Sequence, residues 1–519
     1  MAQLPVRVNT QTSLFPLLSE LQGATVIDAR GDQTYIPSVN PADNAGPVDR
    51  GNPQIFYCHN VMPSTYGLQS IGFKKIYEGE EQNRFQKIKL LVASTDKVRT
   101  YVALDYESEK TIKVLRQDGT WSIPTGAPTG LTKDNQISIA TVNGVSYICV
   151  ALKNVYKYNY EDNELEVVDL DGLNEEEIRG LLSANGYLIA WSLTGVNWSS
   201  VNDPLDFVPS DVTGAGGGKL QEAKGDIVWA QETSYGFIVY TEANIISATF
   251  SGNNTFPFNF KDLAGGGGIA DGDMISQEST GTQYAYTTNG LQSVFHTGVK
   301  TILPYITDFI AGKVFEDFNE DTNTLEISTI DSPFRKKITL INDRYLVVSY
   351  GLYQSQQFTH AIILDLTQSR MGKVKIPHNA AFELKTLDPE VGDTPRESIA
   401  FLDETGEVNV IDFNIRKEDD QGVMILGKYQ FVRQTGIEIQ TADIQNAVEV
   451  GNLTTYLLPI QEGKNFIGVY PEYVLQQDST SKLVSYPSAP ACKSFSILFK
   501  GSFNLVSLVL MMNIHGRFW

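Results

Sequence analysis

Cysteine, histidine and basic side chains are scarce in this chain of 519 residues. The three cysteines, Cys58, Cys149 and Cys492, lie far apart, are odd in number and form no CxxC pair. The sequence therefore indicates neither a zinc ribbon nor a disulfide framework, and it favours synthesis in a reducing compartment. No histidine pairs with another at i,i+4 or within a metal-ligand motif, so we predict no metal site and no cofactor. The histidines are His59, His296, His360, His378 and His515.

Long apolar runs are also absent. The longest, LVSLVLMM at residues 505–512, is far shorter than the ~18 apolar residues of a membrane-spanning helix. The start MAQLPVRVNTQTSLF lacks the basic region and the continuous apolar core of a signal peptide. We therefore expect no membrane-spanning segment.

The charge balance is strongly acidic. Sixty-one acidic side chains against 40 basic ones give a formal net charge of -21. Most of such a surface repels nucleic acid, so the composition argues against a protein that binds DNA by affinity.

The composition is otherwise that of a folded β-protein. The chain is 42% hydrophobic and 19% charged, with many Tyr, Phe and Gly residues, and it is long enough for several domains or for one large repetitive one. Only two stretches indicate helix, LNEEEIRGLLSA with Asn174 as a candidate cap and PYITDFIAGKVFEDF. We interpret both as connectors in an all-β protein.

From about residue 88 the chain repeats a β-hairpin pattern: a β-rich run, a short polar turn, and a second run rich in Tyr, Val and Ile. The clearest turns are Asn143-Gly144 and Asn185-Gly186, because Asn-Gly favours tight hairpins. Asp96-Lys97 and Asn289-Gly290 continue the series.

An aromatic residue that we assign to the start of each inner strand recurs every ~40 to 50 residues, the length of a four-stranded propeller blade. These residues are Tyr101, Tyr147, Tyr187, Phe237 and Tyr284. No WD or kelch signature accompanies them, and later runs are less evenly spaced. We predict an irregular β-propeller over residues 85–415, with segments 1–84 and 416–519 together forming a β-rich platform.

Two glycine-rich stretches resemble ligand loops but fail at required positions. In GAGGGKL, Thr213 and Leu220 stand where a phosphate loop needs glycine and Ser or Thr, so we assign glycines 214 and 216–218 to a tight turn between blades. In GGGGIADGD, Ala270 replaces the aspartate of a calcium-binding nonapeptide.

An acidic loop and a catalytic signature fail in the same way. DFNEDTNTLEIS has an EF-hand-like alternation, but Thr322 replaces the turn glycine and Ser328 the bidentate glutamate. STDKVRTY resembles an Asp box with Val98 in place of glycine, which would indicate fold rather than catalysis. No GxSxG elbow is present, and the pair Cys58-His59 lacks an identifiable orienting group. We predict no catalytic residues and no enzyme, although a carboxylate-pair glycosidase has no fixed motif.

The stretch NDPLDFVPS at residues 202–210 poses the choice between a chemical site and a rigid elbow. Pro204 and Pro209 fix φ and remove donors, so a central strand is excluded. Asp203 and Asp206 can accept hydrogen bonds from nearby amides, and Phe207 can anchor the loop. We predict an elbow.

The run from Trp198 through Ser199, Ser200 and the motif Asp206-Phe207-x-Pro209 resembles the central segment of tail nozzle proteins of short-tailed bacteriophages. FPFNFKDLAGGGG at 256–268 agrees with the same kind of protein. CHNVMPSTYGLQSIGF at 58–73 is similar to a segment of packaged-DNA stabilisation proteins and of tail tubular B proteins. The resemblance covers residues 50–300, and the rest of the chain only in general character.

The resemblance implies a structural virion protein. Such proteins form a hexameric propeller ring below the portal-adaptor ring, extend the DNA channel, retain the packaged genome and pass it during ejection. Implied partners are copies of the chain, the portal-adaptor ring, tail fibre, spike or needle proteins, and genomic DNA that passes without specific binding. The implied location is the virion tail, after synthesis in the host cytoplasm. The alternatives are a propeller that binds or cleaves glycans, as a tail-associated depolymerase or receptor-binding protein, and a cellular scaffold.

Overall fold

The computed structural model describes most of the region 55–412 and individual strands on either side of it. The described residues are 2–9, 24–27, 33–36, 55–63, 68–79, 85–92, 99–116, 120–132, 134–253, 256–302, 314–319, 324–329, 335–351, 357–367, 370–387, 395–412, 422–430, 436–445, 450–459, 470–475, 481–485, 494–505 and 507–515. Within these ranges the regular elements are β-strands and two single-turn 3-10 helices, η1 (Glu175–Glu177) and η2 (Gly272–Met274). The predicted all-β fold is confirmed.

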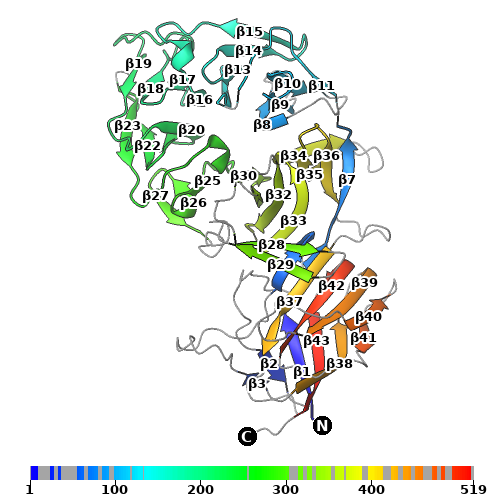
Figure 1. The fold of residues 1–519 in the computed structure, drawn as a ribbon. Helices are drawn as coiled ribbons and strands as arrows, with labels where there is room; N and C mark the ends of the chain where they lie inside the picture. The colour runs from blue at the N-terminus through cyan, green and yellow to red at the C-terminus, as the bar shows by residue number, and fades with distance from the viewer. Residues whose placement is uncertain are drawn as a thin grey trace.

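Seven four-stranded units follow one another around a ring in the described part of the chain (Figure 1). Their first strands line the centre. The first four contact each other in chain order, the last three do the same and return to the first, and η2 lies beside the fourth and the sixth. The ring is therefore a closed β-propeller. We number these units blades 1 to 7.

The first four blades are regular antiparallel sheets. Their strands are β8 (Phe85–Val92), β9 (Arg99–Asp105), β10 (Thr111–Leu115) and β11 (Trp121–Ser122) in blade 1; β12 (Ile137–Val142), β13 (Val145–Val150), β14 (Val155–Asn159) and β15 (Glu164–Val168) in blade 2; β16 (Gly180–Ala184), β17 (Tyr187–Trp191), β18 (Gly195–Trp198) and β19 (Gly216–Lys219) in blade 3; and β20 (Ile227–Thr233), β21 (Gly236–Thr241), β22 (Ile245–Phe250) and β23 (Phe258–Asp262) in blade 4.

The later blades are less regular, as the uneven spacing of the sequence indicated. Blade 5 contains β24 (Ile275–Gln277), β25 (Gln283–Thr287), β26 (Gly290–Phe295) and β27 (Gly298–Thr301). A separate hairpin of β28 (Val314–Asn319) and β29 (Thr324–Thr329) then interrupts the ring. Blade 6 contains β30 (Arg335–Ile341), β31 (Tyr345–Gly351), β32 (Phe358–Asp365) and β33 (Arg370–His378). The end of the expected helical stretch PYITDFIAGKVFEDF is therefore strand β28.

Blade 7 borrows its outermost strand from the other end of the chain. It combines β34 (Ala380–Leu387), β35 (Pro395–Leu402) and β36 (Val408–Asp412) with β7 (Gly72–Tyr77), which pairs antiparallel with β36. The propeller sheet thus reaches back to Gly72, beyond the boundary expected at residue 85. The sequence missed this strand because β7 has no hairpin partner nearby in the chain.

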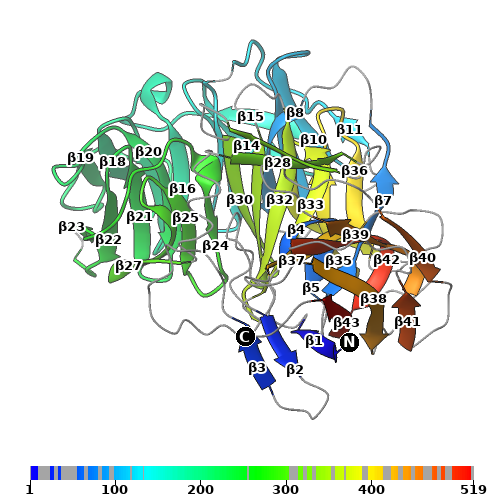
Figure 2. The ribbon, with the colours of Figure 1, turned by 60° about the horizontal axis from the view of Figure 1, so that its bottom comes forward.

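The remaining strands of both chain ends form the platform, which lies beside blades 6 and 7 and away from blades 3 and 4 (Figures 1 and 2). One sheet has the order β3-β2-β1-β43-β38-β41, in which β1 and β43 pair along their length. Its strands are β1 (Ala2–Asn9), β2 (Ala24–Ile27), β3 (Gln33–Ile36), β38 (Gly436–Gln445), β41 (Ser481–Ser485) and β43 (Ser507–His515). The predicted joint platform is confirmed by this pairing.

A second sheet joins the platform to the propeller without a break. From β33 of blade 6 the order continues through β5, β6, β42 and β37 to β4, with β39 and β40 on a side branch. These strands are β4 (Ile55–His59), β5 (Val61–Pro63), β6 (Leu68–Ser70), β37 (Gly422–Gln430), β39 (Val450–Pro459), β40 (Tyr470–Leu475) and β42 (Ser494–Leu505). The two units share backbone hydrogen bonds, not only a contact surface.

The predicted Asn-Gly turns are confirmed. Asn143 (φ 50°) and Gly144 (φ 79°) join β12 to β13, and Asn185 (φ 51°) and Gly186 (φ 88°) join β16 to β17, each with the positive φ of a type I′ turn. In blade 5 the turn lies one residue earlier than predicted, because Gly290 (φ 95°) already pairs with Thr287. The Asp96-Lys97 turn lies outside the described residues.

The recurring aromatic residues lie near the start of the second strand of each of the first five blades, which is an inner strand as predicted. Tyr101 lies in β9, Tyr147 in β13 and Tyr187 in β17. The first strand lines the crowded centre, whereas the second is covered by a blade on each side and takes the large rings. Phe237 and Tyr284 follow the same rule in β21 and β25.

Glycines 216–218 of GAGGGKL form a strand, which corrects the predicted turn between blades, whereas Gly214 (φ 75°) lies in the loop before it. Gly216–Lys219 is β19, the outermost strand of blade 3, paired with β18. A Cβ on Gly217 (φ 148°) would lie 2.2 Å from the Asn197 side chain and 2.6 Å from the Val196 carbonyl, and Gly216 faces the Trp198 ring. Glycine is needed here for close strand approach.

NDPLDFVPS is an elbow, as predicted, and it clasps two blades together. The Asp203 and Asp206 carboxylates accept hydrogen bonds from the amides of Leu205 and Val208, both at 3.0 Å. The Phe207 amide donates to the Asp171 carbonyl in the connection after blade 2, at 2.9 Å. The Phe207 ring is buried in the cluster that joins blades 2 and 3.

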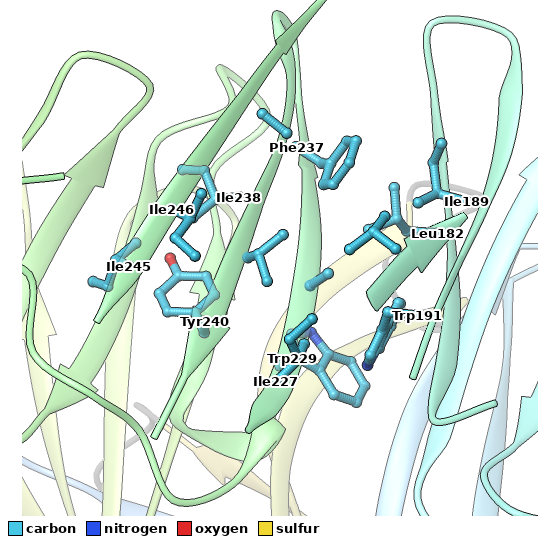
Figure 3. Close-up of a cluster of buried hydrophobic side chains, with 14 of the residues drawn as sticks. Leu182, Ile189, Trp191, Ile227, Trp229, Phe237, Ile238, Tyr240, Ile245 and Ile246 are labelled. Atoms are coloured by element: carbon cyan, nitrogen blue, oxygen red, sulfur yellow. The ribbon is translucent and has the colours of Figure 1, made fainter. Parts of the chain in front are cut away.

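The largest described core cluster joins blades 3, 4 and 5 (Figure 3). The rings of Trp191 and Trp229 meet edge to face at 5.5 Å across the junction of blades 3 and 4. Tyr240, wholly buried, donates a hydrogen bond to Gln283 of blade 5 at 2.7 Å. Neighbouring blades are therefore held by interlocked aromatic packing and a few satisfied polar groups.

Replacing Phe207 by alanine is expected to lower the free energy of unfolding by about 3 to 5 kcal/mol, because the ring fills a buried site between two blades. Val212→Ala in the same loop is the matched control: Val212 is 95% exposed, and a change within about 0.5 kcal/mol is expected. Denaturant unfolding followed by tryptophan fluorescence measures both. Equal losses in the two variants would contradict the anchoring role of Phe207.

Candidate functional site

Three of the five histidines come together where blade 6 meets the platform. His59 of β4, His360 of β32 and His378 of β33 are each at most 1% exposed. The His378 Nε2 atom lies 2.7 Å from the Ser349 hydroxyl, and its Nδ1 atom lies 2.8 Å from the Ile376 carbonyl. The sequence gave no sign of this grouping, because the residues are up to 319 positions apart and meet only through sheet pairing.

Burial keeps these three imidazoles neutral. It lowers the pKa of His59 to about 3 and the pKa of His378 to about 4, and burial together with the charges of Lys373 and Lys375 lowers the pKa of His360 well below its usual value. Lys373 is itself 3% exposed and lies 6.0 Å from the Tyr350 ring centroid. The cluster is a packed polar core and has no access for a substrate. In the described part of the chain, no group of three His, Cys, Asp or Glu residues could hold a metal ion.

Acid is expected to weaken this junction. An unfolded histidine takes up a proton near pH 6.5, whereas buried His378 does so only near pH 4, so the stability contributed by the neutral form is complete above pH 6.5 and is lost as the pH falls towards 4. His378→Gln should reduce the number of protons taken up on unfolding by about one over this interval. The free energy of unfolding then depends less steeply on pH. Urea unfolding at pH 4.5 to 7.5 measures that slope.

The matched control for the acid measurement is Ser349→Ala, which removes the hydroxyl beside His378 but keeps the imidazole. This variant should lose stability at every pH and keep the steep dependence of the wild type. A slope in His378→Gln that equals the wild-type slope would show that this histidine does not stay neutral in the folded chain.

The remaining motif residues are scattered. Asp317 and Asn319 lie in strand β28, so they do not begin a calcium loop, and Asp321 lies outside the described residues. Asn174 caps η1 by accepting a hydrogen bond from the Glu176 amide, as predicted, although the helix has a single turn. Cys58 and Cys149 are buried, and burial raises the pKa of the Cys149 thiol to about 12, which disfavours the reactive thiolate. Cys492 and the first half of the Asp-box-like stretch lie outside the described residues.

Several exposed features lie on one face of the propeller. In an antiparallel blade the turn between the first two strands and the turn between the last two project from the same end of the sheet. We call this side of the ring the turn face. The elbow of blade 3 and the Asn-Gly turns of blades 2 and 3 belong to it.

A groove of about 660 Å³ opens on the turn face at the outer corner of blade 2, and we call it the blade 2 groove. The turn from Gly144 to Ser146 forms one wall, and the segment Lys157–Glu161 forms the other. Exposed Glu161, Glu164 and Glu166 line it. The groove has an acidic rim over an aromatic floor.

Arg116 of blade 1 fixes the tyrosines of this floor. Its guanidinium stacks 4.7 Å from the Tyr160 ring centroid and donates to the Tyr160 carbonyl at 3.0 Å and to the Tyr158 hydroxyl at 3.3 Å. Burial raises the pKa of Tyr158, and the Arg116 charge opposes this shift. The Arg116 contacts hold both rings in place beneath the acidic rim, an arrangement that suits binding.

Large apolar side chains are exposed on the same face over blades 3 to 5. Val212 in the elbow loop of blade 3, Tyr235 in the first turn of blade 4 and Phe256 in its last turn are 95%, 55% and 66% exposed. The Tyr235 ring lies 4.2 Å from the ring of His296 in blade 5. Phe295 is also exposed. Large apolar side chains exposed on one face are candidates for a contact site.

The described residues contain no helix long and apolar enough to cross a membrane. No protein-family model matches the chain, and no curated protein matches it. Solved structures share part of its architecture. An extracellular domain assigned to a one-component system of B. thetaiotaomicron has 12% identity and a TM-score of 0.39, over 98% of this chain and 68% of that one.

Two WD40 propellers show a comparable likeness. The WD40 repeats of RRP9 align with 10% identity and a TM-score of 0.40, over 65% of this chain and 96% of that one. The WD40 propeller domain of Doa1 has 9% identity and a TM-score of 0.38, over 66% of this chain and 97% of that one. Likeness at this level carries no argument about function.

Proposed function

We propose that this protein is a structural subunit of a tail nozzle ring in a short-tailed bacteriophage, without catalytic activity. The observation that best supports this is the way in which both chain ends are built into the fold. Strand β7 completes blade 7, and β4 and β6 pair with strands from the far end of the chain. A subunit that retains a packaged genome needs this kind of cross-linked, rigid construction.

The residues that carry the resemblance have structural roles. Trp198 donates a hydrogen bond to the Gly214 carbonyl at 3.0 Å, Phe207 anchors the elbow, and Asp206 closes a turn. Each of these contacts shapes the exposed loop of blade 3. No catalytic role is needed to account for any of these contacts.

The partners follow from the resemblance. The ring is a hexamer on the portal-adaptor ring, it contacts tail fibre, spike or needle proteins, and genomic DNA passes through its channel without specific binding. The location is the virion tail. In a closed cyclic ring each copy uses one surface to meet the next copy and a different surface to meet the previous one.

Imaging the tail of the virion by electron cryomicroscopy tests the proposal. The expected result is a six-fold ring of this protein below the adaptor, with a central channel. A single central copy, or a peripheral position like that of a spike, would contradict it.

The isolated protein should not bind duplex DNA. Its net charge of -21 repels a polyanion, and an acidic channel wall would let DNA slide without the salt-sensitive contacts that a basic wall makes. An electrophoretic mobility shift assay with duplex DNA at low salt should show free DNA only. Tight binding would defeat this account of the charge and leave the ring assignment intact. If the acidic charge serves only to keep the protein soluble, replacing acidic residues of the channel wall by lysine will not slow the ejection of DNA.

A glycan-binding propeller is the second candidate, and the exposed Tyr235 and Phe256 favour it, because sugar rings stack on exposed aromatic faces. Incubation with host polysaccharides and murein, with and without calcium, separates the two candidates. The ring proposal expects neither binding nor cleavage. Binding that Tyr235→Ala abolishes and Val167→Ala leaves unchanged would favour the glycan candidate, since Val167 is equally exposed on blade 2.

A further inference from the structure

The outer edge of blade 2 and the outer edges of blades 4 and 5 carry opposite charge. Between Lys157 and Arg179 the chain has no basic residue and nine carboxylates, which are Glu161, Asp162, Glu164, Glu166, Asp169, Asp171, Glu175, Glu176 and Glu177. This segment contains β15, the outermost strand of blade 2, and the rim of the blade 2 groove. No other edge of the described ring concentrates charge in this way.

The edges of blades 4 and 5 are basic and apolar. Lys261 in β23 and Lys300 in β27 are exposed on the outermost strands. The carboxylate of Asp262 is already paired with Lys224 at 2.5 Å, and residues 279–302 of blade 5 contain no Asp or Glu. The exposed Phe256 precedes β23 at the turn-face end of that strand, whereas Lys261 lies towards its other end. We call this surface the basic corner.

We infer that the blade 2 groove of one copy of this chain receives the basic corner of a second copy. The charges are complementary, the groove of about 660 Å³ has room for an aromatic side chain such as Phe256, and its floor of Tyr158 and Tyr160 is apolar enough to cover one. The inference rests on the proposed ring, and it names the surfaces that build it.

The arrangement of these surfaces on the propeller fits a closed ring. Strands β15, β23 and β27 lie on different sides of the propeller (Figure 1), two or three blades apart. One copy therefore cannot join its own two surfaces, and in a ring each copy would use its groove for one neighbour and its basic corner for the other. The contact is heterologous, as cyclic rings require.

The net charge makes this pairing selective. Two chains of charge -21 repel each other in most orientations, so association is favoured where a basic patch of one faces an acidic patch of the other. Like-charged edges, blade 2 against blade 2, are excluded by the same argument. The interface therefore fixes the direction of the ring as well as its contacts.

Charge reversal tests the inference. The variant Glu164→Lys/Glu166→Lys makes both surfaces basic, and the variant Lys261→Glu/Lys300→Glu makes both acidic. Each alone should associate about tenfold or more weakly than the wild type, measured by sedimentation velocity over a range of protein concentration and by native mass spectrometry. Asp134→Lys/Glu107→Lys, which reverses two exposed charges away from both surfaces, is the matched control and should assemble like the wild type.

The two reversal variants should rescue each other. In an equimolar mixture the basic groove of one faces the acidic corner of the other, and the acidic groove of the second faces the basic corner of the first. Assemblies with the two chains in alternation are expected, and a chain carrying all four substitutions should also assemble alone. Unchanged thermal melting of each variant shows that its fold is intact.

Three results would overturn the inference: wild-type-like assembly by both reversal variants, failure of the mixture to associate, and a wild-type chain that stays monomeric at every concentration. Wild-type-like assembly by both variants would not contradict the proposed tail ring, because a six-fold ring seen in virions can use other surfaces. Absence of the ring from virions defeats the proposed function, whereas mutual rescue in solution would still establish this contact.

Discussion

Closure of the ring at blade 7 is the constraint on which the rest of the structure depends. Blade 7 draws only three strands from its own stretch of chain, and without β7 the strand β36 would be an open edge. At the seam with blade 1, the rings of Tyr101 and Phe382 lie 4.5 Å apart, and Asn379 donates a hydrogen bond to the Phe85 carbonyl. Because β7 follows β4, β5 and β6 directly, the segment that closes the ring also threads the platform.

This threading explains why buried ionisable side chains collect at the junction. Sheet pairing between β33 and β5 brings His59 against blade 6, where His360 and Lys373 are already enclosed. Burial of such groups costs stability unless they are neutral or have polar partners, and the lowered pKa of each histidine reflects that cost. A joint built only from apolar residues would be less sensitive to acid.

The outer edges of the blades are less restricted than the centre of the ring. Inner strands must pack against two neighbours, so their sequences are restricted, whereas the outermost strands meet solvent or a partner. Acidic β15 and lysine-bearing β27 can therefore differ without disturbing the ring, whereas the glycines of β19 are needed for its close approach to β18. Such variation gives one propeller distinct surfaces on different sides, which a directional assembly needs.

The sequence by itself determined the all-β class, the hairpins at Asn143-Gly144 and Asn185-Gly186, and the elbow at Phe207, because each depends on residues adjacent in the chain. Only the tertiary structure decided the number of blades, the transfer of β7 to blade 7 and the meeting of His59 with His360, since these depend on pairing between strands hundreds of residues apart. It likewise placed the aromatics on the second strands and built the blade 2 groove from two turns and an arginine of the neighbouring blade. Local signals record backbone preference, whereas closure, burial and surface charge arise when distant segments are brought together.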